Sequence, residues 1–212
     1  MSRPSQLPYR NASPITFDQR DKWFSDSASV GSRCNGVIDT APLEIKLDPR
    51  VKTSADDLRK QFDLLLKLRD REDEMNKAVL AIRDLRSQLQ GLERRLGSQD
   101  ETKSLVTSST DLRKKITAIE EELIQVNATA QEDEANYPVK LNSKLGYLTG
   151  VTDSADTAPT PAESAVFTEL DRQLEAQLVK WREVMVKDLP ALNDAARKAN
   201  IMLVAPATPK SD

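Results

Sequence analysis

Apolar residues recur every three or four positions along much of the chain, which is the spacing of one face of an α-helix. The first such stripe predicts a helix from about Ala55 to Leu96, capped by Thr53 or Ser54. A helix of this length spans about 60 Å and has to lay its apolar stripe on partners. The stripe is interrupted around Glu72, and its apolar positions are Leu58, Phe62, Leu65, Met75, Val79, Ile82, Leu85, Leu89, Leu92 and Leu96.

Two further stripes predict two more long helices. The second runs from about Thr110 to Glu134, with apolar positions at Leu112, Ile116, Ile119, Leu123, Val126 and Ala130. A short helix or turn is expected after Pro138, which breaks the second helix, and it closes at Gly150.

The third long helix begins with a strong start signal: Thr160 as cap, Pro161 at the first helical position and Glu163 completing a capping box. Pro190 is expected to disturb or end this helix. Its apolar face comprises Phe167, Leu170, Leu174, Leu178, Trp181, Met185 and Leu189.

Three long stripes joined by modest loops predict an all-α fold, an antiparallel three-helix bundle. Because the stripes are close to heptad spacing, coiled-coil-like packing at about 20° is expected. The bundle is assigned to residues 49–192, and residues 193–212 are expected to form a C-terminal tail after a last turn or two of helix.

The N-terminal part of the chain has no such period. Residues 1–41, rich in Ser, Pro, Asn and Asp, are expected to form an irregular arm. Residues 42–48 predict a single strand, because Leu43, Ile45 and Leu47 alternate with charged residues. No partner strand is predicted, so Leu43, Ile45 and Leu47 form a possible interaction edge.

Composition narrows the classes of partner. The chain of 212 residues is 31% charged and 4% aromatic, which suits long solvated helices, and its net charge of −3 gives no bulk attraction to nucleic acid or an anionic membrane. No apolar run approaches the length of a membrane span, and residues 1–17 have no apolar run that could serve as a signal peptide. Localisation stays open.

The residues for most catalytic and metal chemistry are missing from the sequence. There is no histidine, and Cys34 is the one cysteine, which excludes a Ser-His-Asp triad, a Cys-His pair and His-containing or Cys₄ metal sites. No Gly-rich phosphate loop is present. The acidic runs "RDREDE", "IEEEL" and "QEDEA" are expected on solvated helix faces. We therefore expect no catalytic residue, no cofactor and no metal, and expect the chain not to be an enzyme.

Two stretches carry a resemblance to a known family: "PLEIKLDPRVKTSADDLRKQFDLLLKLRD" and "NYPVKLNSKLGYLTGVTDSADTAPTPAESAVFTELDRQLE". Together they resemble the C-terminal helical region of large bacterial proteins with BNR-type or sortilin-type β-propellers, described as glycosyl hydrolases or exo-sialidase-like proteins. The resemblance covers roughly residues 42–192, and its most specific parts are "DPRVKTS", "NYPVKLNSKL" and "SADTAPT".

The resemblance implies that the strand at 42–48 is the last strand of a β-rich segment that follows the propeller. The propeller itself is absent, since no Ser-x-Asp-x-Gly-x-Thr-Trp box occurs in the chain. Any carbohydrate-processing site of the family would lie in the propeller, so no catalytic residue carries over. Family members are typically exported, and this chain is interpreted as a truncated relative or a fragment.

Three functions fit these observations. The first is a non-catalytic helical accessory or interaction module, whose partner is a β-propeller or β-sandwich protein. The second is an independent coiled-coil adaptor or homodimer, because helical stripes packed within one chain and between two chains look alike in sequence. The third is a hydrolase (glycosidase), which needs two carboxylates facing each other about 5–10 Å apart.

Overall fold

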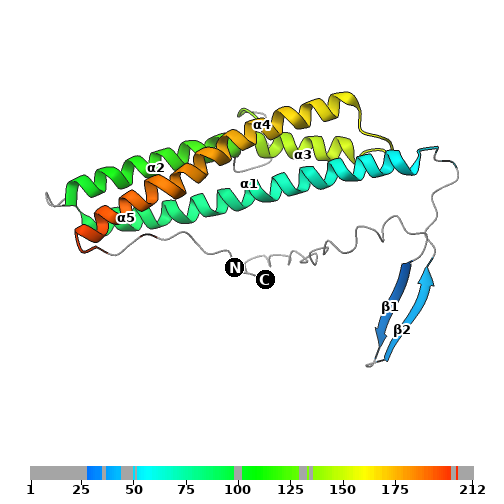
Figure 1. Ribbon diagram of the computed structural model, residues 1–212, viewed down its shortest axis with the longest axis horizontal. Coiled ribbons are helices and arrows are strands. Elements are labelled where there is room, and N and C mark those ends of the chain that lie inside the picture. The colour runs from blue at the N-terminus through cyan, green and yellow to red at the C-terminus, as the bar shows by residue number, and fades with distance from the viewer. Residues whose placement is uncertain are drawn as a thin grey trace, which may run out of the picture. The chain divides into compact units, whose positions relative to one another are not determined.

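The computed structural model of the chain describes residues 28–34, 37–43, 50, 52–97, 102–128, 133, 136–201 and 204 (Figure 1). The chain divides into two compact units, Met1–Lys52 and Thr53–Asp212. Each unit is described by itself.

The N-terminal unit contains a β-hairpin. Strands β1 (Ala28–Cys34) and β2 (Val37–Leu43) pair antiparallel in a register that runs from Ala28 opposite Leu43 to Cys34 opposite Val37. In the sequence, Asn-Gly occupies positions 35 and 36 between them, the dipeptide that two-residue hairpin connections prefer. The prediction of an irregular arm is therefore wrong for residues 28–34 and 37–41.

The prediction of a lone strand over residues 42–48 is not confirmed. Leu43 is the last residue of β2 and has a partner, Ala28 of β1. Ile45 and Leu47 lie outside the described residues. Within the described part of the chain, the strand thus lies earlier than expected and belongs to a hairpin.

In the second unit, the described secondary-structure elements are helices. In chain order they are α1 (Ala55–Leu96), α2 (Lys103–Leu123), α3 (Leu141–Thr152), α4 (Pro161–Glu183), the π-helical segment η4 (Val184–Asp188) and α5 (Leu189–Lys198).

Helix α1 has the predicted bounds. The Ser54 hydroxyl accepts a hydrogen bond from the Asp57 N–H at 3.1 Å, and the helix ends at Gly97, whose φ of 61° suits glycine. Its buried stripe repeats every seven residues at Gln61, Leu68, Met75, Ile82, Leu89 and Leu96. The first turns bury Gln61, Leu64 and Leu68, whereas Leu58, Phe62 and Leu65 are half-buried, so the predicted stripe is out of phase there.

Helix α2 is displaced from its predicted position of about Thr110 to Glu134. It starts earlier because Leu105 and Ser109 are buried and extend the stripe back through a Ser/Thr-rich stretch. It ends at Leu123, and residues 124–128 are not helical. There the Gln125 side chain donates a hydrogen bond to the Pro138 carbonyl at 3.0 Å, which ties the segment leaving α2 to the segment entering α3.

The last helix is continuous across Pro190 but changes its hydrogen-bond pattern. Thr160, Pro161 and Glu163 form the predicted capping box at its start. Near its end, the Leu189 N–H donates to the Val184 carbonyl five residues back, in the π-helical segment η4. Pro190, which has no N–H and therefore disturbs the regular α-helical pattern, sits at the start of α5.

The last turns of helix that were expected before the C-terminal tail lie in α5 (Leu189–Lys198). Helix α5 extends to Lys198, well beyond the boundary at 192, and buries Ala196. Beyond it, Val204 is 4% exposed, and its backbone N–H and C=O both bond the Asn193 side chain, at 3.0 and 2.8 Å. The described part of this segment therefore belongs to the packed unit.

The helices form a bundle in which α2, α3 and α4 all contact α1 (Figure 1). Arg83 of α1 contacts Glu120 of α2, and Glu93, later in α1, contacts Arg113, earlier in α2, so α1 and α2 run antiparallel. The core between the helices is almost entirely aliphatic, with Trp181 as its one buried aromatic among the described residues.

Candidate functional site

The outer edges of the hairpin are the first candidate site. In the described part of the chain the sheet consists of β1 and β2, so each strand has one edge without a neighbouring strand. Such an edge presents backbone N–H and C=O groups that can pair with another strand. The two edges differ, because β2 contains Pro42, which has no N–H to donate, whereas β1 contains no proline.

Of the three residues predicted as an interaction edge, the structure places one. Leu43 ends β2, and Ile45 and Leu47 lie outside the described residues. Strand β1 was not predicted, although two short runs flanking Asn-Gly are a strong hairpin signal.

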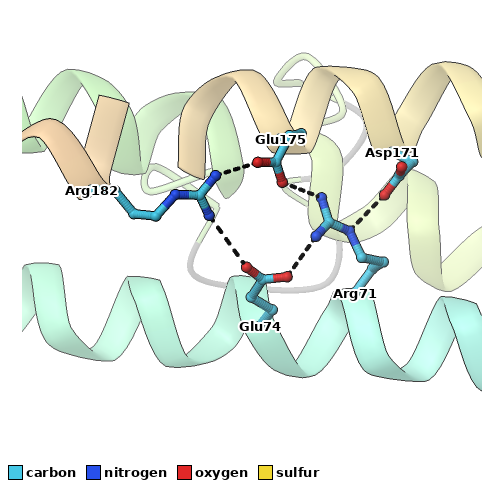
Figure 2. A network of polar contacts seen from close by, with 5 residues as sticks. All are labelled: Arg71, Glu74, Asp171, Glu175 and Arg182. Atoms are coloured by element: carbon cyan, nitrogen blue, oxygen red, sulfur yellow. Dashed lines mark hydrogen bonds and ion pairs between the residues drawn. The ribbon is translucent and has the colours of Figure 1, made fainter. Parts of the chain in front are cut away.

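A network of five charged side chains joins α1 to α4 (Figure 2). Arg71, whose side chain is 19% exposed, lies at its centre. Its Nη1 donates to Glu74 at 2.5 Å, its Nη2 donates to Glu175 at 3.0 Å, and its Nε lies 2.6 Å from Asp171 in an ion-pair contact without hydrogen-bond geometry. Arg182 closes the ring by pairing with Glu175 and with Glu74.

The network shifts the pKa values of two of its members, Glu175 and Arg71. The pKa of the Glu175 carboxyl lies below its usual value because Arg71 and Arg182 donate hydrogen bonds to it. Burial disfavours the charge on Arg71, but its hydrogen bond to Glu175 and the nearby carboxylates of Asp171 and Glu74 outweigh burial and raise the Arg71 pKa. Glu175 and Arg71 are thus held in their charged forms at neutral pH.

This network explains the gap in the α1 stripe around Glu72. Between buried Leu68 and buried Met75, α1 contacts its neighbours through polar groups instead of apolar ones. On the α3 side, the Thr149 hydroxyl donates to Glu72 at 3.0 Å. The interruption in the sequence therefore marks a polar layer of the bundle.

A second polar layer contains a buried carboxylate. The Glu120 side chain is 1% exposed, and its two oxygens pair with Arg83 Nε at 2.7 Å and with Arg86 Nη1. The prediction that the "IEEEL" run lies on a solvated face is wrong for Glu120. The helical period indicates that Glu120 is buried, because it lies four residues after Ile116 and three before Leu123, both of which are buried.

A third polar contact ties α1 to the end of α3. Gln61, which is 7% exposed, donates from Nε2 to the carbonyls of Thr152 and Ala155, both at 2.7 Å. These carbonyls lie where α3 ends and lack helical partners of their own. Gln61 thus serves as a side-chain cap supplied from another helix.

Clefts on the surface of the helical unit include two that are lined by described residues. One, of about 320 Å³, lies between α2 and α5 and is spanned by the ion pair of Lys115 with Asp188. The other, of about 360 Å³, lies between the segment leading into α3 and the outer side of α4. Among the described residues, no group of three or more His, Cys, Asp and Glu side chains is placed to hold a metal ion.

Comparisons with protein-family models, with curated proteins and with solved structures give no match for this chain. In the described part of the chain, none of the helices combines the length and the apolar character that crossing a membrane requires.

Proposed function

We propose that the chain is a non-catalytic helical module that binds a β-rich partner through the strand edges of its N-terminal unit. The observation that carries this proposal is the two-stranded sheet in the described residues. A two-stranded hairpin alone is marginally stable in water, and a third strand, or packing on another surface, is what stabilises it.

The free edge of β1 is the best candidate for adding a partner strand. Strand addition relies on main-chain hydrogen bonds, so it needs an edge with its N–H groups intact. Pro42 removes one N–H from β2, and β1 retains all of its own. The edge predicted from the sequence at Leu43, Ile45 and Leu47 is part of the same proposal, as a continuation of β2.

The helical unit supports the proposal in a different way. Its apolar stripes face one another, and Arg71 and Arg83 of α1 pair with carboxylates of α4 and α2 within the chain. We read the unit as an antiparallel three-helix bundle in which α2 and α3 together form the second member. Such a bundle serves as a rigid support, and the binding surface is supplied by the N-terminal unit.

The resemblance to the helical region of BNR-type and sortilin-type proteins suggests the class of partner. In that family the helices follow a β-rich segment, so a propeller or sandwich domain is the partner that the hairpin would complete. A hydrolase activity in this chain has less support, because the charged clusters in the described residues pair carboxylates with arginine or lysine rather than with a second carboxylate.

Self-association is the second candidate, favoured by large exposed apolar side chains. Tyr147 on α3 is 77% exposed and Val186 in η4 is 74% exposed. In a homodimer, these side chains or the β1 edges of two copies would meet. The chain would then act as an adaptor by itself.

Light scattering on the purified chain separates these proposals. A module that needs a foreign partner is expected at 23.6 kDa, and a homodimer at twice that mass. The variant Ser29→Pro removes an N–H from the free edge of β1, because Ser29 lies opposite Pro42 in a pair that is not hydrogen-bonded and its N–H therefore points away from β2. It is compared with Ser29→Thr, which keeps the N–H. A dimer that Ser29→Pro abolishes and Ser29→Thr retains supports pairing through β1 edges. A dimer that survives both changes contradicts a role for this edge.

A further inference from the structure

The cleft beside α3 differs from the other polar clusters in its balance of charge. It is lined by the segment around Lys140, by the first turn of α3 with Lys144, and by Arg172 of α4. Glu122 is the one carboxylate among its lining residues. In a chain of net charge −3, this is a local excess of positive charge.

The cations of the cleft are compensated to different degrees. Lys140 pairs with Glu122 at 3.2 Å, and Arg172 makes two hydrogen bonds to Glu169, at 2.7 and 2.9 Å. These bonds, together with one from Gln173, hold the pKa of the exposed Glu169 at about 2. Among the described residues, Lys144 has no carboxylate within ion-pair distance.

The neutral groups of the cleft add further donors. The side-chain amide oxygen of Gln177 accepts a hydrogen bond from Lys180 at 3.1 Å, which leaves the amide NH₂ group to donate. The apolar part of the cleft wall is formed by Pro138, Val139 and Ala176. The cleft thus combines ammonium, guanidinium and amide donors with one acceptor carboxylate, and a ligand that satisfies it has to supply acceptor oxygens and negative charge.

We propose that this cleft binds an oxyanion, a phosphate or carboxylate group, held by Lys140 and Lys144 with Arg172 and the Gln177 amide beside them. Its volume of about 360 Å³ accommodates such a group together with a small organic moiety. Glu122 pairs with Lys140 and therefore competes with the ligand.

The test is an NMR titration of the full chain with inorganic phosphate, with chloride adjusted to keep the ionic strength constant. The expected result is a saturable shift of the backbone amides of residues 140–144. Lys140→Met with Lys144→Met is expected to weaken binding at least about tenfold, as the loss of two charge-assisted contacts predicts. Glu122→Gln is expected to strengthen it about threefold, because the competing charge is removed.

Lys77→Met is the matched control, since Lys77 lies on α1, pairs with Asp73 and does not line the cleft. It should leave phosphate affinity unchanged. A parallel titration with acetate tells phosphate from carboxylate, and saturation by either anion supports the proposal. Shifts that do not saturate, or that chloride reproduces, overturn it. Unchanged phosphate affinity in the double lysine variant also overturns it. Misfolding would weaken phosphate binding, so the increase in affinity expected for Glu122→Gln cannot result from misfolding.

Discussion

The buried carboxylate of Glu120 provides the sharpest test of how the helices are held in register. Its partners differ in burial, since the Arg83 side chain is 50% exposed and that of Arg86 is 28% exposed. Removing one arginine leaves the carboxylate with the other. Removing both leaves a buried charge without compensation, which is the costly way to break such a cluster.

The expected loss of stability depends on whether one arginine or both are removed. Arg83→Ala and Arg86→Ala are each expected to lower the free energy of unfolding by about 1–2 kcal/mol, because the remaining arginine still pairs and solvent screens the exposed partner. The double variant is expected to lose about 3–5 kcal/mol, more than the two single losses together. Glu120→Ala is expected to lose about 2–4 kcal/mol, since both arginines can turn to water.

The assay is urea unfolding followed by helical circular dichroism at 25 °C and low salt. Glu121→Ala is the matched control, because Glu121 is the exposed neighbour in the same helix and its removal should change stability by less than about 0.5 kcal/mol. Losses in the double variant that equal the sum of the two single losses would show that Glu120 is not energetically buried, and would refute the reasoning.

Three further predictions concern the other polar contacts. Glu175→Gln should reduce the loss of thermal stability at acid pH. The pKa of Glu175 is lowered in the fold, so its stabilising contribution is present above the unfolded-state pKa of about 4.3 and is lost as pH falls through the folded-state pKa. Melting scans between about pH 5 and pH 2 would show the difference. Thr160→Ala should lower the free energy of unfolding by about 1 kcal/mol and Tm by about 2–4 °C, because the capping hydroxyl is lost. Thr168→Ala, at an exposed position in the middle of the same helix, should change neither. Gln61→Leu should destabilise the fold by about 1–2 kcal/mol in urea, although it adds an apolar side chain, because two carbonyls lose their donor; unchanged stability would contradict the capping role.

The sequence predicts α1 and the start of α4 well, and the reason is the same in both. A long apolar period fixes the course of each helix, and local side chains fix the ends: Ser54 and Gly97 for α1, Thr160 and Glu163 for α4. Local chemistry is readable from sequence because the interacting residues are three or four positions apart.

The start of α2 is less readable because its first two turns are rich in serine and threonine. The Thr107 and Ser108 hydroxyls donate to the carbonyls four residues earlier, so these residues are accommodated in the helix although their type favours turns. Ser109 occupies a buried position where an apolar residue would have revealed the stripe.

The polar layers could not be predicted in detail, because their members are far apart in sequence. Arg71 and Glu175 are separated by 104 positions, and Gln61 and Thr152 by 91. The sequence showed the gap around Glu72, but the partners that fill it depend on how the helices are arranged. Donors in the cleft beside α3 likewise come together through the placement of α4 against the segment before α3.

The apolar stripes of the helical unit pack against one another within the chain, and we propose that the N-terminal hairpin takes up a partner strand. Hydrogen exchange measured by mass spectrometry on the full chain as a monomer compares the two units in one experiment. We predict that the amides of α1 and α4 are strongly protected and that those of β1 and β2 exchange quickly, because a lone hairpin is marginally stable. Protection of residues 28–43 equal to that of α1 in a monomer would contradict the proposal, since the strand edges would then be satisfied within the chain.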